Sequence, residues 1–421
     1  MKGRPTGDPR RDAADVLLRV LDGRARSTDL LNEVLAAYPA DSRDAGLLHE
    51  LVMGVLRRRL ALEAVLGRLV RRPLDRTRPE IREILMILAY SALFLGRIPP
   101  HARVHAAVEA ARRVGGEPAA RFVNAVGRGL ERLLADGDPL AGLAPAVRAS
   151  VPAWVDAAAH AADPEPWDDA TYDALAGRSA TTLRAHGGAA GRDALLGRLG
   201  ELGIAAAPAR WSPDGVVLEG GAPLRLPELV PRRAVPQDEA SQLVVHALAP
   251  RDGERIADLC AGVGIKTSQV LGLAPGASVL AVDLDGRRLD RADALCRDAG
   301  PGRPERLAAD ARRLPDALAG TFDAVLLDAP CTGLGTLVRR PEVRYVRRPG
   351  DVDAAASLQA DLLAAAMRLV RPGGRLVYAV CSFAPAEGDA IVDRTLAASP
   401  GFAREPVPLD GPFVGADGAL R

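Results

Sequence analysis

From Gln237 onward, short aliphatic segments typical of buried strands alternate with segments that have the periodicity of amphipathic helices. The expected strands are Arg255–Cys260, Ser278–Asp283, Phe322–Asp328 and Gly374–Cys381. The expected helices begin at Lys266 and cover Arg287–Arg297 and Leu358–Val370. Strands that are each followed by a helix form a mainly parallel, doubly wound sheet with helices on both faces. The alternation therefore predicts an α/β domain of the Rossmann-like type, with ligands at the carboxyl ends of its strands.

In residues 1–140 the apolar residues recur with the period of an amphipathic helix, and this spacing predicts an all-helical bundle. Leu, Val, Ile and Ala recur every three or four residues, and turn residues interrupt the pattern, as at Gly115-Gly116. The expected helices are Asp15–Leu21, Thr28–Leu35, Leu47–Leu69, Pro79–Phe94, His101–Val114 and Ala119–Leu134. Residues 1–145 hold 24 Lys and Arg against 18 Asp and Glu. Their arginine clusters, such as Arg57-Arg58-Arg59, fit either phosphate contacts with RNA or solvated helix ends.

The middle of the chain, residues 141–232, is expected to be a connector followed by a small α+β unit. Its expected elements are a strand at Ala180–Ala185, a helix at Ala190–Leu202 and strands at Val216–Leu218 and Leu224–Leu226. The chain is thus predicted to have three parts: a helical domain over 1–140, the middle unit over 141–232 and the α/β domain over 233–421.

Composition excludes several classes of protein. With 48% hydrophobic and 26% charged residues, the 421-residue chain is not wholly disordered. No stretch approaches the roughly 18 apolar residues of a membrane-spanning helix. The four cysteines form no Cys-x-x-Cys pair that would indicate a metal site, and the first ten residues lack the apolar core of a secretion signal. We expect a cytoplasmic monomer without a metal, whose thiols stay reduced.

The segment from Asp258 to Lys266 fills the first strand-to-helix turn of the α/β domain. Gly262 and Gly264 allow the backbone to approach a ligand closely, and the next strand ends at Asp283, where nucleotide-binding folds place a carboxylate on a ribose. Asp258 would repel a pyrophosphate, whereas it would tolerate a cofactor with an ammonium group. S-adenosylmethionine has an ammonium, a free ribose diol and a sulfonium, and it fits these residues. For Asp283 the structural alternative is a helix cap.

Two of the four cysteines lie where a ligand is expected. Cys331 and Cys381 follow the carboxyl ends of strands that should be neighbours, whereas Cys296 falls within a helix and is expected to be an inert buried residue. Two thiols beside a methyl donor suggest thiolate attack on an electrophilic ring; inert burial is the alternative. Lys266 is one of only two lysines among 55 basic residues, which indicates that the turn needs a compact cation.

Several motifs carry a family resemblance. They are Gln237–Leu243, Asp328-Ala-Pro-Cys331, Arg339-Arg-Pro-Glu342, Leu369–Tyr378 and Cys381-Ser382 with Pro385 and Glu387. Together they resemble the RNA 5-methylcytosine methyltransferases of the Sun/Nop family. The helical part, with Gly54–Arg58 and Arg121–Val126, is similar to the NusB-like domain fused to bacterial 16S ribosomal RNA methyltransferases of the RsmB type. The resemblance covers nearly the whole chain.

The resemblance implies a function and a set of site residues. The activity would be S-adenosylmethionine-dependent methylation of cytosine C5 in RNA, with 16S ribosomal RNA as the expected partner. Cys381 would attack ring carbon C6, Cys331 would assist release of the product, and Asp328 would hold the base edge. The implied cofactor contacts are Cys260, Ala261, Gly262, Val263, Gly264, Ile265, Lys266, Asp283, Asp310 and Asp328.

The sequence departs from the family pattern in the cofactor turn and near its end. The family turn reads Ala-Pro-Gly-Gly-Lys, whereas this chain has Gly262-Val263-Gly264-Ile265-Lys266. If the turn requires a positive φ at position 265, we expect Ile265 to change its backbone. Family members continue into a closing strand beyond the point where this sequence stops, so we expect either that this strand is absent or that the edge of the sheet is built differently. The alternatives to the favoured function are the same chemistry on another RNA, such as transfer RNA, and a non-catalytic RNA-binding or ribosome-assembly protein.

Overall fold

The computed structural model describes residues 5–39, 42–163, 165, 167–219, 232–412, 414–415 and 417–420. The chain packs into two compact units. The first, here called the helical unit, runs to Ser179 and also includes Gly333–Pro349; the second, the sheet unit, consists of Ala180–Thr332 and the residues from Gly350 onward. Residues 141–179 therefore pack with the helices, and the three-part division at residues 140 and 232 stays a prediction.

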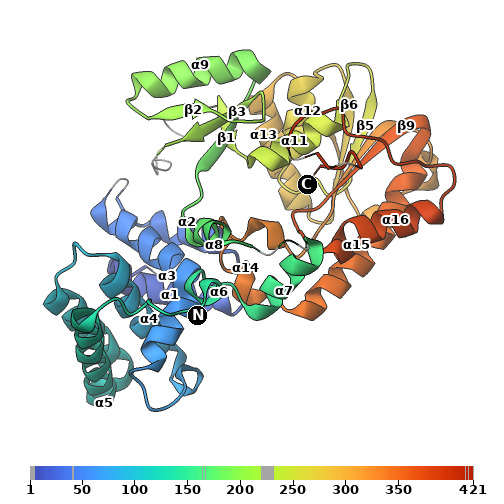
Figure 1. The fold of residues 1–421 in the computed structure, drawn as a ribbon. Coiled ribbons are helices and arrows are strands. Elements are labelled where there is room, and N and C mark those ends of the chain that lie inside the picture. The colour runs from blue at the N-terminus through green and yellow to red at the C-terminus, as the bar shows by residue number, and fades with distance from the viewer. Residues whose placement is uncertain are drawn as a thin grey trace. The chain divides into compact units, whose positions relative to one another are not determined.

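The helical unit is built from helices (Figure 1), and the first five of them lie at the places that the apolar period predicts. They are α1 (Pro9–Leu21), α2 (Ser27–Leu35), α3 (Arg43–Gly67), α4 (Pro79–Phe94), α5 (Pro100–Asp136), α6 (Pro145–Arg148), α7 (Ala153–Ala162), α8 (Asp169–Ala176) and, later in the chain, α14 (Val343–Val346). Helix α5 is broken at the expected Gly115-Gly116, where Gly116 has a φ of 67°, so α5 consists of two helical arms. Leu17, Leu51, Leu62 and Leu85 are fully buried in the core of this bundle.

A small antiparallel sheet opens the sheet unit. Its strands are β1 (Thr181–Ala185), β2 (Ala206–Pro208), β3 (Gly215–Leu218) and β4 (Ala234–Pro236), in the order β2-β3-β1-β4. Helix α9 (Gly188–Glu201) covers this sheet by packing Leu195 and Leu199 against Leu183 and Val216. The strand expected at Leu224–Leu226 lies outside the described residues.

The second sheet is the predicted parallel sheet, with the strand order β7-β6-β5-β8-β9. Its strands are β5 (Arg255–Asp258), β6 (Ser278–Asp283), β7 (Glu305–Ala308), β8 (Phe322–Asp328) and β9 (Val370–Ala379). Strand β7 escaped the sequence analysis because it is an edge strand with largely exposed side chains, so it carries no apolar run. Strand β9 begins four residues before the expected Gly374 and follows α15 (Pro349–Leu369) directly.

Helices cover both faces of the parallel sheet (Figure 1). Ile256 and Ala324 face α11 (Glu239–Leu248), α12 (Ile265–Leu273) and α13 (Gly286–Ala299). Ala257 and Val325, one position further along the same strands, face α15 and α16 (Asp389–Ala397). Successive residues of a strand point to opposite faces, which explains why the expected strands read as continuous apolar runs. Within the described ranges, no helix has the length and apolar character needed to cross a membrane.

Candidate active site

Acidic and thiol side chains gather at one edge of the parallel sheet. Asp258, Asp283 and Asp328 are the last residues of β5, β6 and β8, and Asp310 and Cys381 follow β7 and β9 by two residues. Because all the strands are parallel, their carboxyl ends lie at the same edge. The strand order reverses between β5 and β8, which is where sheets of this kind bind their ligands. The sheet thus brings together the residues that the sequence singled out.

Two glycines shape the turn between β5 and α12. Gly262 has a φ of 57° and Gly264 a φ of 80°, both in the left-handed region that favours glycine. A Cβ at Gly264 would come within 2.5 Å of the Ala292 Cβ on α13, so a larger residue cannot fit there without displacing that helix. Ile265 begins α12 and does not have a positive φ. The turn therefore does not require a positive φ at Ile265, because its left-handed positions are occupied by glycines.

Asp283 faces the glycine turn. Its Oδ2 accepts a hydrogen bond from the Gly262 N–H at 2.9 Å, and its Oδ1 accepts one from the Asp285 N–H at 2.9 Å. The N-cap of α13 is Asp285, which accepts from the Arg287 N–H. The capping interpretation of Asp283 is therefore wrong, since its carboxylate accepts from the backbone of the glycine turn; its contact with a ribose stays a prediction.

Asp258 is a buried carboxyl with one oxygen unused. Its side chain is 1% exposed, Oδ2 accepts from the Thr267 hydroxyl at 2.7 Å, and Oδ1 has no partner among the described residues. Burial is the main cause that raises the pKa of Asp258 to about 6. A buried, unpaired carboxyl oxygen at the cofactor turn suits an ammonium group or an ordered water, and it disfavours a phosphate.

Lys266 pairs with the aspartate at the end of β8. Its Nζ lies 2.5 Å from the Asp328 Oδ2, so the cation of the turn meets the carboxylate that precedes the first cysteine motif. A lysine gives a compact charge that can reach one carboxylate oxygen from the first turn of α12. This pair ties the cofactor turn to the cysteine-bearing loop after β8.

Cys331 and Cys381 lie together. Their sulfurs are 3.2 Å apart, within hydrogen-bonding distance, and neither forms a disulfide. Cys381 is exposed and Cys331 is half-buried, whereas Cys296 is fully buried, as expected for an inert residue. The hydrogen bond with Cys381 and partial burial both raise the pKa of Cys331. Both effects therefore favour the thiol form of Cys331.

Glu387 connects the two cysteine loops, a role that the sequence analysis did not assign. It is fully buried, and it accepts from the backbone N–H of Thr332 at 2.8 Å and from the hydroxyl of Ser382 at 2.5 Å. Gln359 of α15 donates both to Glu387 and to the Pro330 carbonyl, at 3.1 and 2.8 Å. One carboxylate therefore holds the residues next to both cysteines. In the sequence, Glu387 stood out only as part of the motif that follows Cys381, which gave it no structural role.

Three other expected cofactor residues have different surroundings. Asp310 caps a short helical turn and pairs with Arg312 at 2.7 Å, and this hydrogen-bonded pairing lowers the pKa of Asp310 to about 2. Cys260 is partly exposed, and burial is the main cause that raises its pKa to about 12. Ala261 donates its N–H to the Val282 carbonyl at 2.9 Å, which fixes the turn against β6. The role of each as a cofactor contact stays a prediction.

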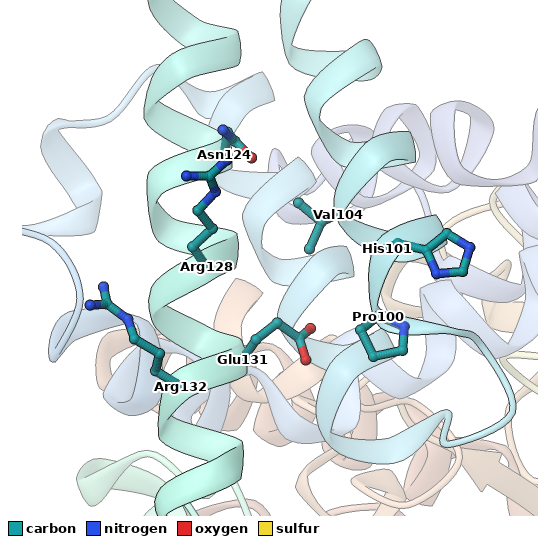
Figure 2. Close-up of a pocket in the computed structure, with 7 residues that line it drawn as sticks. All are labelled: Pro100, His101, Val104, Asn124, Arg128, Glu131 and Arg132. Atoms are coloured by element: carbon teal, nitrogen blue, oxygen red, sulfur yellow. The ribbon is translucent and has the colours of Figure 1, made fainter.

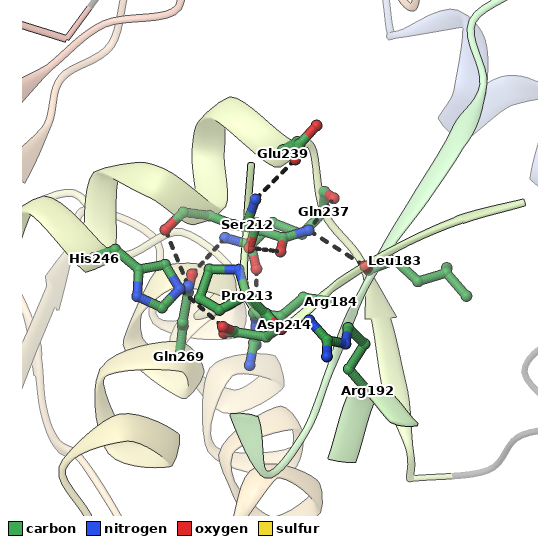
Figure 3. A network of polar contacts seen from close by, with 11 residues as sticks. Leu183, Arg184, Arg192, Ser212, Pro213, Asp214, Gln237, Glu239, His246 and Gln269 are labelled. Atoms are coloured by element: carbon green, nitrogen blue, oxygen red, sulfur yellow. Dashed lines mark hydrogen bonds and ion pairs between the residues drawn. The ribbon is translucent and has the colours of Figure 1, made fainter. Parts of the chain in front are cut away.

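A buried polar network supports the helix that carries Lys266 (Figure 3). Arg184 of β1 is 2% exposed and donates to the Gln237 side chain at 2.6 Å, to the Ser268 hydroxyl at 2.6 Å and to the Ile265 carbonyl at 3.3 Å. Gln269 extends the network by accepting from the amide of Gln237 at 2.8 Å. The small sheet therefore holds the first turn of α12, and with it the cofactor turn.

These residues fit S-adenosylmethionine. Gly264 leaves no space for a side chain between the turn and α13, Asp258 offers an unpaired oxygen, and Asp283 stands at the end of the neighbouring strand. When bound, this cofactor supplies an electrophilic methyl group on a sulfonium. Gly262, Gly264, Asp283 and Asp328 are the residues that would hold it.

The parallel sheet, the glycine turn and the cysteine pair define an S-adenosylmethionine-dependent methyltransferase domain. A family model described as "16S rRNA methyltransferase RsmB/F" matches residues 245–417, and the "NusB family" model matches residues 8–132. The chain is 35% identical to "Ribosomal RNA small subunit methyltransferase B" of Pseudomonas putida, over 94% of this chain and 91% of that protein. It is also 35% identical to the protein of the same description from Sodalis glossinidius, over 95% and 94%. The chain belongs to this RsmB/F family of methyltransferases.

Solved structures show the same fold. The crystal structure of PH0851 has a TM-score of 0.75 at 21% identity and covers 96% of this chain and 92% of that one. The structure of NSun6 from Pyrococcus horikoshii, solved with SFG, has a TM-score of 0.52 at 18% identity, over 61% of this chain and 90% of that one. At these identities the likeness concerns the fold.

Proposed function

We propose that this protein methylates carbon C5 of a cytosine in 16S ribosomal RNA, in the cytoplasm, through a transient bond between Cys381 and the base. The observation that carries the proposal is the pair of cysteine sulfurs 3.2 Å apart at the carboxyl ends of β8 and β9. An RNA methyltransferase acting on a ring nitrogen or an exocyclic amine would not need two thiols at this place. The names of the family's curated members support ribosomal RNA of the small subunit as the substrate.

The chemistry assigns a different task to each side chain. The Cys381 thiolate attacks C6 of the ring, which makes C5 nucleophilic, and C5 then accepts the methyl group. A base removes the proton from C5, and the electron pair of that C–H bond re-forms the ring double bond as the Cys381 sulfur leaves. Cys331, held as a thiol beside Cys381, stabilises negative charge on the Cys381 sulfur by donating a hydrogen bond. The target base has to leave any helical stack to reach both thiols.

A groove in the helical unit supports RNA as the partner (Figure 2). A pocket of about 630 Å³ lies between the two arms of α5 and is lined by Pro100, His101, Val104, Asn124, Arg128, Glu131 and Arg132. Arg103 neutralises Glu131 through two hydrogen bonds of 2.8 and 2.7 Å. Arg128 and Arg132 have no hydrogen-bonded or ionic partner within the part of the chain that the structure describes. We propose that these two arginines contact the RNA phosphate backbone.

The test of the proposed chemistry is a covalent trap. Cys331→Ala, incubated with 16S ribosomal RNA and S-adenosylmethionine, is expected to accumulate a protein–RNA adduct that survives a denaturing gel, because Cys381 attacks but release is impaired. Cys381→Ala should lose at least about 10³-fold in methyl transfer and still bind S-adenosylmethionine. The double variant should give no adduct.

Bisulfite sequencing of the RNA product then identifies the methylated position. Near-normal turnover by Cys381→Ala would contradict the covalent mechanism. Methylation of transfer RNA instead of 16S ribosomal RNA would contradict the substrate assignment. Failure of the wild-type protein to bind millimolar S-adenosylmethionine would favour a non-catalytic RNA-binding protein.

A further inference from the structure

A segment of the methyltransferase sequence folds as part of the helical unit. Residues 333–349, here called the inserted segment, lie within the range that matches the methyltransferase family model, yet they pack with α2, α3, α6 and α8. The segment starts at Gly333, two residues after Cys331, and ends before Gly350, which begins the sheet unit again. The chain therefore leaves the sheet unit directly after a cysteine of the candidate site.

Arg344 is the main anchor of the inserted segment. It is 1% exposed and its Nη1 donates to the carbonyls of Ala149 at 2.6 Å, Ser150 at 3.2 Å and Arg57 at 3.4 Å, while its Nη2 donates to the Leu175 carbonyl at 2.5 Å. No carboxylate accepts from this guanidinium in the described residues. A buried cation held only by carbonyls is costly unless the surrounding backbone stays fixed, so Arg344 joins α3, α6 and α8 to the segment.

Glu342 and Tyr345 add two further anchors. Glu342 is 2% exposed and accepts from the Ser27 hydroxyl at 2.9 Å, at the first residue of α2, where unpaired backbone N–H groups favour an anion. The Tyr345 hydroxyl donates to the Leu56 carbonyl of α3 at 2.9 Å. Both contacts join residues that are almost 300 positions apart or more. None of the three anchor residues contacts the candidate active site. The proposed reaction therefore does not explain why these contacts are present.

The junction between the inserted segment and the candidate site consists of Thr332 and Gly333, and Thr332 is hydrogen-bonded to the sheet unit. Thr332 is tied to Glu387, the residue that also holds the Cys381 loop, whereas Gly333 begins the helical unit with a φ of 79°. A displacement of the helical unit would therefore act on Cys331 through one glycine. The arginine groove proposed to contact RNA lies on that same helical unit.

We infer that Arg344, Glu342 and Tyr345 are positioning residues that set the place of the Cys331 loop through the inserted segment. The helical unit would then act on the release step of the reaction as well as on RNA binding. This inference rests on the proposed function. It assigns to the NusB-like part a role inside the catalytic cycle that simple tethering of RNA would not require.

The test compares anchor variants with Cys331→Ala. Glu342→Gln, Ser27→Ala and Arg344→Met are expected to accumulate the covalent adduct although Cys331 is present, and to lower kcat by about tenfold. The Kd values for RNA and S-adenosylmethionine should change less than about twofold, because none of these substitutions alters a residue proposed to bind RNA or the cofactor. Arg344→Lys should recover part of kcat, since an ammonium can donate to several of the same carbonyls.

A matched control separates positioning from loss of stability. Asp12→Ala removes a buried carboxylate elsewhere in the helical unit, which accepts from Tyr38 and Thr6, and it should lower Tm without adduct accumulation. If the anchor variants give no adduct and keep kcat while Cys331→Ala does trap one, the inference fails and the proposed function stands. If Cys331→Ala also traps nothing, the proposed function fails first. Ser27→Ala and Glu342→Gln are small changes that keep the test valid should Arg344→Met not fold.

Discussion

The acidic side chains at the candidate site have different surroundings, and only Asp258 is fully buried. Asp328 is paired with Lys266 and Asp310 with Arg312, whereas Asp258 forms no ion pair: its Oδ2 accepts from the Thr267 hydroxyl and its Oδ1 is unused among the described residues. Desolvation disfavours the ionised form of a carboxyl that has no cation beside it. Asp258 is therefore the acid of the site whose ionisation costs folding free energy when no cofactor is bound.

We expect the stability of the protein to fall with rising pH because of Asp258. In the folded protein the pKa of Asp258 is about 6, above the ordinary 3.8. The stabilisation that the protonated carboxyl gives the folded protein is therefore fully present below about pH 4 and is lost as the pH rises through 6. Asp258→Asn has no such ionisation. Between pH 3 and 7 the free energy of unfolding of the wild type should therefore fall by about 3 kcal/mol relative to the variant.

Denaturant unfolding of both proteins at a series of pH values measures this difference. The relative free energy should level off above pH 7, because Asp258 is then ionised in both the folded and the unfolded state. Parallel curves for the two proteins across the whole range would show that Asp258 is ionised throughout and would contradict the burial argument.

At the scale of single elements, α12 is the helix that the cofactor site depends on. Its first turn carries Lys266, its start is set by Gly264, and Arg184 holds it from the small antiparallel sheet. The helix packs against α13 so closely that the Gly264 position has no space for a Cβ. Small changes in the same helix should therefore have very different effects, depending on where they fall.

Gly264→Ala is expected to destabilise the protein by about 2–5 kcal/mol, from an unfavourable left-handed conformation and overpacking against Ala292. It should also weaken S-adenosylmethionine binding, because the turn has to move away from α13. The matched control is Gly272→Ala in the same helix, where a Cβ meets nothing within 4 Å. That control should be neutral or stabilise by up to about 1 kcal/mol. Equal effects of the two substitutions, measured by thermal unfolding and cofactor titration, would refute the packing argument.

At the scale of the whole molecule, the two units have separate tasks in the proposed function. The sheet unit carries the methyl-transfer site, and the helical unit carries both the arginine groove and the anchors of the inserted segment. Substitutions in the helical unit should therefore divide into two groups. Those in the groove should change RNA affinity, and those at the anchors should change turnover.

Arg128→Ala combined with Arg132→Ala is expected to weaken RNA binding by about 10-fold or more at low salt, and to reduce the salt dependence of binding by roughly one to two phosphate contacts. The rate at saturating RNA should stay near the wild-type rate. The charge-matched control, Arg291→Ala with Arg394→Ala, removes two exposed arginines of the sheet unit. Filter binding at several salt concentrations measures both effects. An equal loss of affinity in the control would mean that the groove has no special role.

The sequence by itself determined those features that depend on local pattern. Apolar runs marked β6 and β8 with their correct bounds, and so placed Asp283 and Asp328 at strand ends. The period of three and four residues located the helices of the first part, and Gly115-Gly116 marked the break in α5. These predictions succeeded because side-chain burial alternates with a fixed period in each kind of element.

Only the tertiary structure decided which distant residues meet. The edge strand β7 has too little burial to leave an apolar pattern, and Glu387 gained its role only when β8, β9 and α15 came together. The assignment of Arg344 to the helical unit depends on carbonyls almost 170 to 290 positions away. A backbone carbonyl is present in every residue, so no sequence signal marks the ones that a buried guanidinium will find, and packing alone selects them.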